Sequence, residues 1–289
     1  MPRHLIAVVC AAAVMLLPVA AATGAGDATE ARSAAATGDP QAARSGAGTA
    51  TARTAAARTA GPAVNGVPSG LAQERYGPVL LELFTSQGCS ACPPADQLLA
   101  RLAPREDLLP LSFHVSYWDH MGWSDPFAIA ASVRRQRGYA RAMRSRSIFT
   151  PQLIVQGAAS AVGSDEARIM RLIAEAPPVI RLGITREPGD LERFTVRIPA
   201  LPNVTVALEL WAVLYASGDQ RYVPQGENAG HVLRHVNVVR DAGIVGVVEA
   251  TPAIVEFDRP DIPAIDGLAM ILQARNLGPV VGTGVLALR

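Results

Sequence analysis

The spacing of apolar residues predicts alternating strands and helices in the first ordered part of the chain. An apolar run at Val79–Phe84 predicts a strand that ends at a polar turn. Leu109–Tyr117 predicts a second strand, whose blurred alternation suits burial on both faces of a sheet. Ser124 or Asp125 is expected to cap a following helix. The helices are predicted over residues 95–103, 126–146 and 165–176, and a further strand is predicted after Pro151.

From Pro177 onward the pattern changes to short β-rich runs separated by Gly, Pro, Asn and Asp. Several strands at short spacing with turn signals between them are typical of a β-sandwich. The sequence therefore predicts an all-β sandwich domain over residues 178–289. The runs are Val179–Thr185, Phe194–Ile198, Val204–Tyr215, His231–Val239, Ala253–Phe257, Ala269–Ala274 and Val280–Leu288.

The N-terminal region predicts an exported protein. A basic start at Arg3 and His4 precedes the apolar run Leu5–Ala22, which predicts a signal peptide over residues 1–22. The alternative is an uncleaved membrane anchor, because about 18 apolar residues are just enough to span a bilayer. Residues 23–76 are rich in Ala, Thr and Arg and predict a disordered linker. We expect a periplasmic or secreted protein with no membrane association after cleavage.

Composition excludes several classes of function. The formal net charge is +1, which gives no electrostatic reason to expect a nucleic-acid partner. Neither a G-x-G-x-x-G fingerprint nor a P-loop occurs, so no nucleotide, nicotinamide or flavin cofactor is expected. Of the three cysteines, signal cleavage removes Cys10. The remaining pair, Cys89 and Cys92, would form a structural or redox-active disulfide in an oxidising compartment.

The C-x-x-C pair stands where a predicted strand gives way to a predicted helix, which is the thioredoxin arrangement. There the unpaired N–H groups and the positive end of the helix dipole stabilise a thiolate. We expect Cys89 to be the attacking thiolate and Cys92 the resolving thiol. The alternative is a static disulfide that closes the turn.

Two further features accompany the pair. Thr150-Pro151 leads directly into an apolar strand, as in thioredoxins, where a cis-proline stands beside the cysteines and the preceding residue receives a bound peptide. Glu82 is the one acid in the first strand and is a candidate proton relay, although its side chain could point to the other face.

An aromatic stretch follows the second strand. Its polar and aromatic side chains could line a substrate groove beside the cysteines, or they could pack the two predicted domains together. The candidates are His114, Tyr117, Trp118, Asp119, Trp123 and Asp125.

Two other function classes stay open. Cys89 and Cys92 with His114 or His120 could hold Cu(I) or Zn(II), although no metal site is predicted. The β-sandwich could instead be a binding module, with Gly226–Gly230 as a tight polar loop in which Asn228 takes an unusual backbone conformation. The histidines at positions 231 and 235 are expected to form an exposed ladder on one strand.

The order of these motifs resembles a family of secreted bacterial thioredoxin-like proteins, domain-of-unknown-function family 1223. The resemblance covers about residue 79 to the C-terminus and implies no established reaction. It rests on LELFTSQGCSACPPAD, FHVSYWDHMGWSDPFA, RQRGYA, FTPQLIVQG and GENAGHVLRHVNVVR.

Together these patterns predict a thioredoxin-like α/β domain with a C-x-x-C over residues 77–177, followed by the β-sandwich. The expected function is thiol–disulfide exchange on periplasmic proteins or small-molecule thiols and disulfides. Periplasmic copper handling and a non-catalytic binding module with a structural disulfide are the alternatives.

Overall fold

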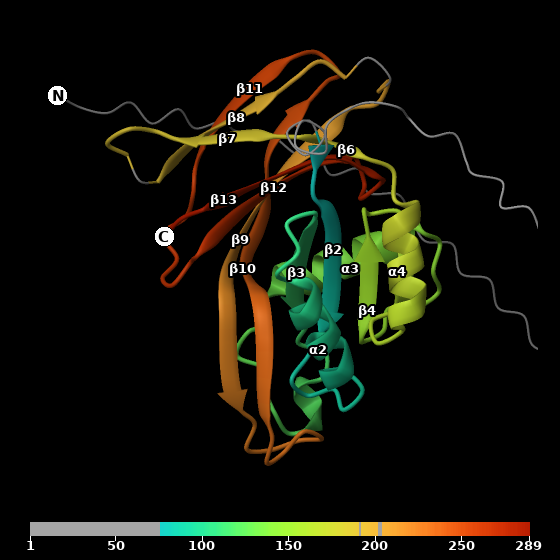
Figure 1. Cartoon of the computed structure of the whole chain (residues 1–289). Coiled ribbons are helices and arrows are strands. Elements are labelled where there is room, and N and C mark those ends of the chain that lie inside the picture. Colours follow the sequence, from blue (N-terminus) through green and yellow to red (C-terminus); the bar gives the residue numbers. More distant parts are fainter. Residues whose placement is uncertain (1–75, 191, 202–203) are drawn as a thin grey trace, which may run out of the picture. The chain divides into compact units, whose positions relative to one another are not determined.

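Two β-sheets contain the strands of the described part of the chain, residues 76–190, 192–201 and 204–289 of this computed structural model (Figure 1). These residues all lie within the same compact unit. The larger sheet is formed by β1 (Tyr76–Gly77), β2 (Val79–Thr85), β3 (Leu108–His114), β4 (Gln152–Val155), β5 (Ala159–Val162), β6 (Val179–Arg181), β9 (Leu208–Tyr222), β10 (Val232–Val248), β12 (Gly267–Ala274) and β13 (Val280–Ala287). Its order is β1-β6-β13-β12-β9-β10-β3-β2-β4-β5. The smaller sheet has the order β11-β8-β7, with β7 (Gly183–Arg186), β8 (Arg193–Ile198) and β11 (Ala253–Asp258).

The predicted fold class, a thioredoxin-like α/β domain followed by a separate β-sandwich, is wrong. Strand β10 pairs in parallel with β3 through Val238 and Ser112, so one mixed sheet runs across both predicted parts. Apolar periodicity shows which residues form strands, but it does not show which strand edges meet. A free edge of β3 would present unpaired backbone groups, and β10 covers that edge.

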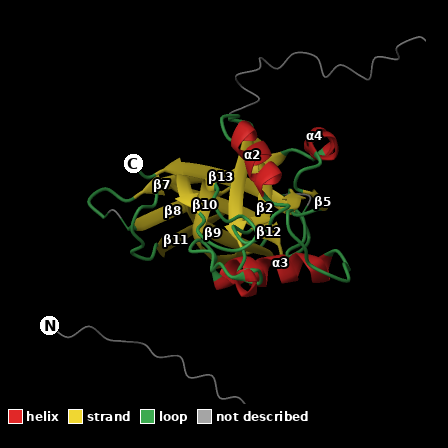
Figure 2. Cartoon of the chain, turned by 90° about the horizontal axis from the view of Figure 1, so that it is seen from below, coloured by secondary structure: helices red, strands yellow, loops and turns green. Residues whose placement is uncertain are grey.

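The larger sheet is covered on both faces by helices (Figure 2). Helices α2 (Pro93–Leu102) and α4 (Glu166–Glu175) lie over one face, and α3 (Ala130–Ala142) lies over the other. Side chains of β2 alternate between these layers. Leu81 and Leu83 pack with α2 and α4, whereas Leu80 and Phe84 pack on the α3 side. The predicted burial of the second strand on both faces is confirmed for β3.

The smaller sheet packs against strands β9 and β12 of the larger sheet. Phe194 and Val196 of β8 are fully buried and share an apolar core with Leu210 of β9 and Leu268 of β12. The predicted β-rich runs are confirmed as strands, with shifted ends.

The longest elements form the β9–β10 hairpin, whose strands of 15 and 17 residues exceed the predicted runs. The hairpin descends beside β3 and α2 (Figure 1). Its connection, residues 223–231, is called the hairpin tip below. The unusual backbone conformation predicted for Asn228 is instead taken by its neighbours Gly226 and Gly230, which have positive φ values of 79° and 83°. Glycine adopts this region without a steric penalty.

The predicted start of the second helix is wrong. Helix α3 begins at Ala130 rather than at Pro126, and neither Ser124 nor Asp125 is its N-cap. Helix α4 agrees with the prediction, and Asp165 caps it by accepting a hydrogen bond from the backbone N–H of Arg168. The Asp125 side chain bonds to His114 instead of capping the helix.

The predicted signal peptide, Cys10 and the predicted linker up to residue 75 lie outside the described residues. Within the described ranges, no helix combines the length and apolar character needed to cross a bilayer.

Candidate functional site

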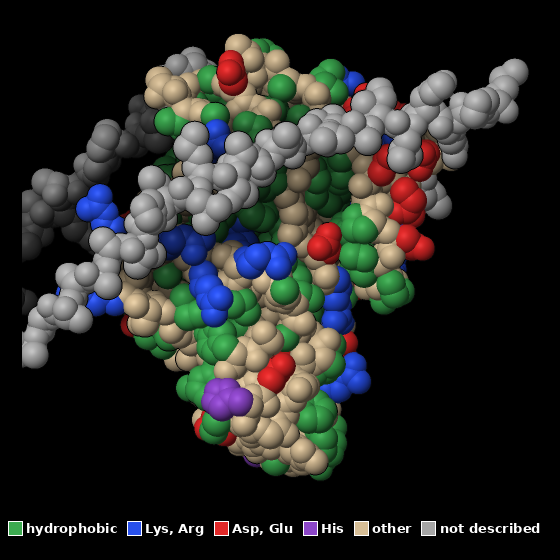
Figure 3. Space-filling view, turned by 180° about the vertical axis from the view of Figure 1, so that it is seen from behind, with side chains coloured by type: hydrophobic (Ala, Val, Ile, Leu, Met, Phe, Trp, Pro, Cys, Tyr) green, Lys and Arg blue, Asp and Glu red, His purple; other side chains and the backbone are tan. Residues whose placement is uncertain are grey.

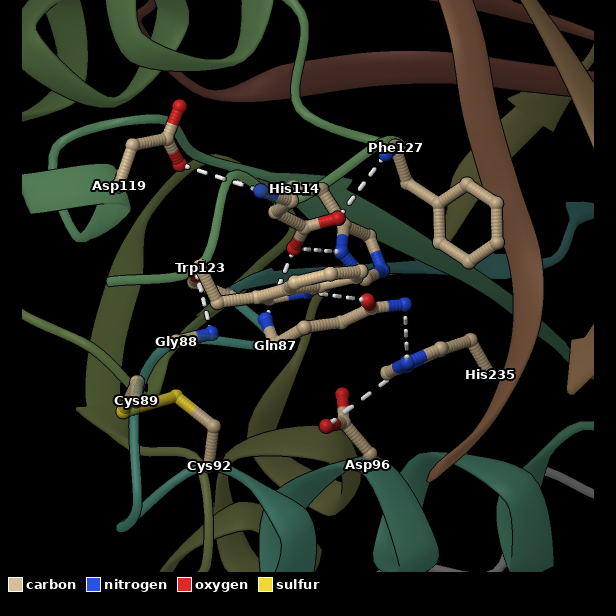
Figure 4. Close-up of polar contacts among 12 residues, drawn as sticks. Gln87, Gly88, Cys89, Cys92, Asp96, His114, Asp119, Trp123, Phe127 and His235 are labelled. Carbon is tan, nitrogen blue, oxygen red and sulfur yellow. Dashed lines mark hydrogen bonds and ion pairs between the residues drawn. A yellow bond between two sulfur atoms is a disulfide. The ribbon is translucent and has the colours of Figure 1, made fainter. Parts of the chain in front are cut away.

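The cysteine pair lies where β2 gives way to α2, as predicted. Cys89 and Cys92 form a disulfide, with 5.4 Å between their Cα atoms. The backbone N–H of Cys92 donates to the carbonyl oxygen of Cys89, which closes the turn before the helix. Figure 4 shows the disulfide beside a layer of buried polar side chains.

Both cysteines are buried: Cys89 is 1% exposed and Cys92 is 0% exposed. The hairpin tip binds the turn that contains them. Asn228 donates from Nδ2 to the carbonyl oxygens of Gln87 and Cys89, at 2.9 Å each. Glu227 accepts a hydrogen bond from the backbone N–H of Ser90, and the side chain and backbone of Ser90 together lower the pKa of the Glu227 carboxyl. A segment about 140 positions later in the chain therefore packs on the disulfide turn.

The first turn of α2 offers fewer donors than predicted. Pro93 and Pro94 have no backbone N–H, and the N–H groups of Ala95 and Asp96 both donate to the carbonyl oxygen of Cys92. The expected unpaired N–H groups are therefore absent from these positions. Within α2, only the helix dipole remains to stabilise a Cys92 thiolate.

The Thr150-Pro151 peptide bond is cis, as predicted. Pro151 lies near the first turn of α2, because a Cβ added to Gly163 would come within 3.0 Å of both Pro151 and Ala95. Trp118 holds Thr150, the residue before this proline, because its Nε1 donates to Thr150 Oγ1 at 2.6 Å. The structure thus brings Thr150, Pro151 and Trp118 to the turn that carries the disulfide.

Two histidines and two carboxyl groups are buried behind the disulfide (Figure 4). His114 on β3 bonds through Nδ1 to Asp125 Oδ2 at 2.7 Å, and its ring packs edge-on against His235 of β10 at 4.5 Å. Nε2 of His235 lies 3.3 Å from Nε2 of Gln87, while its Nδ1 lies 3.7 Å from Asp96 Oδ2. The predicted exposure of His235 is wrong, because the residue is 1% exposed.

Asp125 is the best-satisfied member of this cluster. Besides His114, it accepts hydrogen bonds from the backbone N–H groups of Gln87 and Phe127, at 2.8 and 2.9 Å. Burial alone would raise the pKa of Asp125, but His114 and these donors outweigh burial and lower it. This carboxylate therefore fixes the Gln87 turn to the loop after β3.

Asp96 and His235 are the least satisfied members. Neither carboxyl oxygen of Asp96 has a hydrogen-bond partner, although the residue is only 4% exposed. Nδ1 of His235 and Nε2 of His114 also have none. Buried polar groups without partners are rare in folded proteins, and each one calls for an explanation.

Glu82, the predicted proton relay, lies on the opposite face of the sheet. Its carboxylate accepts hydrogen bonds from Arg135 Nε and from the Tyr139 hydroxyl, both on α3. Burial lowers the pKa of Arg135, but the charge of Glu82 and the hydrogen bonds outweigh it and raise the pKa. Burial also raises the pKa of Tyr139. The structure does not bring Glu82 together with the α2 face.

The other groove candidates shape the loop after β3. Trp123 donates from Nε1 to Gln87 Oε1 at 3.0 Å and packs beside Gly226 of the hairpin tip. Asp119 accepts a hydrogen bond from the backbone N–H of Asp125. Tyr117 is half-buried, and burial raises its pKa.

Sequence reasoning missed Asp96, Gln87 and His235 as parts of the site. Asp96 had a usable signal, because it follows Cys92 by four positions and therefore shares its helix face. Gln87 and His235 had none, since their proximity depends on the pairing of β10 with β3.

No three His, Cys, Asp or Glu side chains among the described residues are arranged to hold a metal ion. His120, one candidate for a metal site, is exposed, and its Nδ1 lies 2.9 Å from the carbonyl oxygen of Tyr117.

Residues 80–273 match the model of the family described as "Protein of unknown function (DUF1223)". The chain belongs to this family. It is also similar to the crystal structure of protein AGR_C_4864 from Agrobacterium tumefaciens, with 26% identity and a TM-score of 0.62 over 73% of this chain and 94% of that chain. HBP35 of Porphyromonas gingivalis is similar at 14% identity with a TM-score of 0.48, over 73% of this chain and 75% of that one. No curated protein matches the chain.

Proposed function

We propose that this protein is a thiol–disulfide oxidoreductase whose redox pair is Cys89 and Cys92. The observation that carries the proposal is the buried pair behind the disulfide, Asp96 and His235, which face each other at 3.7 Å without a hydrogen bond between them. A disulfide that only cross-links the chain needs no such groups. It would also stabilise little here, because the closed loop is very short.

The exchange proceeds in two balanced steps with an external thiol. An external thiolate attacks Cys89 Sγ; the Cys89–Cys92 bond breaks, and its electron pair goes to Cys92 Sγ. A second external thiolate attacks the external sulfur of the mixed disulfide and releases an external disulfide and the Cys89 thiolate. Two external thiols are oxidised while the protein disulfide is reduced. The reverse sequence reduces external disulfides.

The Cys92 thiolate needs a proton source, because the first turn of α2 offers no free N–H group. Asp96 lies one turn further along the same helix, on the face that carries Cys92 (Figure 4). Asp96 faces His235, and His235 lines a cavity of about 410 Å³ together with Asp219 and Arg234. In this proposal Asp96 gives its proton to the Cys92 thiolate and recovers one from His235.

The other charged groups near this route are already engaged. His114 is bonded to Asp125, and Glu227 is bonded to the backbone of Ser90. They position the turn and leave Asp96 and His235 as the pair free to exchange a proton.

Access to the sulfurs requires the hairpin tip to move, because both cysteines are covered. Exposed Ser90 and Ala91 mark the side from which a partner reaches the turn. The co-substrates are thiols and disulfides of exported proteins or small molecules, consistent with the predicted signal peptide. A role in an oxidising compartment follows from the same prediction.

The first test is the reduction potential of the pair, measured on the full chain with Cys10→Ser to remove the third cysteine. Titration against glutathione should give a value in the oxidoreductase range, roughly −120 to −270 mV. Cys92→Ser should then trap a mixed disulfide between Cys89 and a thiol substrate. A potential below roughly −300 mV without turnover of a model disulfide would make the pair a structural cross-link.

A hairpin-tip variant separates a covered disulfide from an inert one. Asn228→Ala removes two hydrogen bonds from the turn, so reduction by dithiothreitol should become several-fold faster. Gln225→Ala, an exposed change in the same tip, is the matched control and should react like the parent. Equal rates in all three proteins would contradict gating by the tip.

A further inference from the structure

A cavity of about 570 Å³ lies between α3 and β9, on the face of the larger sheet that α3 covers. This volume falls within the range of about 300–1,000 Å³ that is usual for small-molecule sites. Arginine side chains gather in the middle of this side of the molecule (Figure 3). The cavity is lined in part by Arg134, Arg135, Arg141, Glu209, Trp211 and Leu277.

Two buried donors at this cavity lack acceptors. Arg135 is 2% exposed; its Nη2 donates to Tyr139 and Gln273, but its Nη1 has no hydrogen-bond partner. The Trp211 Nε1 has none either. The two groups are neighbours, because Arg135 Cζ lies 4.6 Å from the centroid of the Trp211 ring. Both donor atoms are enclosed by protein, so a ligand in the cavity meets the exposed arginines of the lining, Arg134 and Arg141.

The charges around the cavity favour an anion. Glu82 offsets the charge of Arg135, whereas Arg134 and Arg141 have no ion pair within the described residues. The one acid in the lining, Glu209, lies 3.9 Å from Arg275 Nε, which offsets its charge. Two arginines therefore remain without a counter-charge. A guanidinium group matches the planar fork of a carboxylate better than a point charge does.

The rest of the wall is apolar. Leu277 is 6% exposed and presents its side chain beside Gly138 of α3, and Trp211 adds an aromatic ring. A bare inorganic anion would leave this surface uncovered in a cavity of this size, whereas an apolar body attached to the anion would cover it.

We propose that this cavity is a binding site for a small organic carboxylate, whose carboxylate pairs with Arg134 and Arg141 and whose apolar body packs on Trp211 and Leu277. The site is on the opposite face of the sheet from the disulfide. The proposal therefore stands whether or not the cysteines exchange disulfides.

Calorimetric titration of the full chain tests the chemistry with three probes. Phenylacetate carries both the charge and the ring, 2-phenylethanol carries the ring without the charge, and acetate carries the charge without the ring. Phenylacetate should bind saturably at one site and at least about tenfold more tightly than either partial probe. Absence of saturable phenylacetate binding overturns the proposal, and so does equal binding of 2-phenylethanol.

Paired variants on α3 locate the site. Arg134→Gln with Arg141→Gln removes the two unpaired charges and should weaken phenylacetate binding at least about tenfold. Arg137→Gln with Arg144→Gln makes the same charge change at exposed positions outside the lining and should weaken it less than about twofold. Trp211→Ala removes the ring on which the apolar body packs and should weaken binding several-fold. Equal losses of phenylacetate affinity in the two double variants would attribute the binding to general surface charge and would overturn the proposed site.

Discussion

The two faces of the ten-stranded sheet bury charged side chains in opposite ways. On the α3 face, Glu82 is matched by Arg135 and Tyr139, and Gln273 completes the network by donating to Tyr139. On the α2 face, Asp96 is buried without a hydrogen bond to either oxygen. Both carboxyl groups lie within a few residues of the same disulfide in sequence, yet their surroundings differ completely.

This difference separates buried side chains that stabilise the fold from buried side chains that can take part in the proposed reaction. A buried charge that is fully paired is held in one state, because removing its partner is costly. A buried group without a partner can gain or lose a proton without breaking a network. On this ground we assign Glu82 to the framework and Asp96 to the proposed exchange. Three substitutions test the contrast.

The largest effect is expected on the α3 face. Glu82→Gln leaves the buried Arg135 without its counter-charge, so the free energy of unfolding should fall by about 3–5 kcal/mol. Chemical denaturation monitored by circular dichroism measures this. Glu166→Gln removes an exposed partner of Arg101 and serves as the control, with a change of about 0–1 kcal/mol. A loss below about 1 kcal/mol for Glu82→Gln would show that the pair is not the framework described.

An intermediate effect, with a defined pH dependence, is expected at Asp125 on the α2 face. Asp125→Asn loses acceptor capacity toward His114 and two backbone donors, so stability near neutral pH should fall by about 2 kcal/mol. The pKa of Asp125 is lowered by folding. Its contribution is therefore complete above the usual carboxyl value of about 3.9, and it is lost as the pH falls through the folded pKa.

Denaturation curves of the parent and Asp125→Asn below about pH 4 check this dependence. The parent should lose stability more steeply as the pH falls, so the two proteins converge. Parallel curves would show that Asp125 does not carry the acid sensitivity assigned to it.

The smallest effect on stability, and a larger one on rate, is expected at Asp96. Asp96→Asn replaces a buried carboxyl group that accepts no hydrogen bond by a neutral amide, so the free energy of unfolding should change by less than about 1 kcal/mol or rise. The rate of disulfide reduction by dithiothreitol should fall at least about tenfold, because the Cys92 thiolate loses its proton source. A stability loss above about 2 kcal/mol with an unchanged rate would make Asp96 a structural partner of His235.

Several local features were predictable because they depend on neighbours in the chain. The Cys89–Cys92 pair, the strand before it and the helix after it follow from short-range pattern and turn chemistry. The cap at Asp165 follows from its place just before the apolar face of α4. The family motifs were also readable, since they are ordered blocks of sequence.

Features that depend on distant pairing were not predictable. The sequence position of Glu82 predicted a proton relay beside the cysteines. Strand alternation instead places its side chain toward α3. A shift of one residue in the register of the strand would place it on the opposite face of the sheet. His235 was predicted to be exposed, but the packing of β10 against β3 and α2 buries it. Asn228 reaches the disulfide turn because β9 continues to Tyr222, well past its predicted end at Tyr215, and so moves the hairpin tip along the chain.

The sequence by itself determined the cysteine pair that forms the disulfide, the cis-proline segment beside it and the strands of the C-terminal part. It also determined the family. Only the tertiary structure decided that one ten-stranded sheet joins the two predicted parts and that the hairpin tip covers the disulfide. It alone showed that the proton-handling candidates are Asp96 and His235. The physical reason is that backbone edges and buried polar groups find their partners across the whole chain, whereas periodicity reports only on residues a few positions apart.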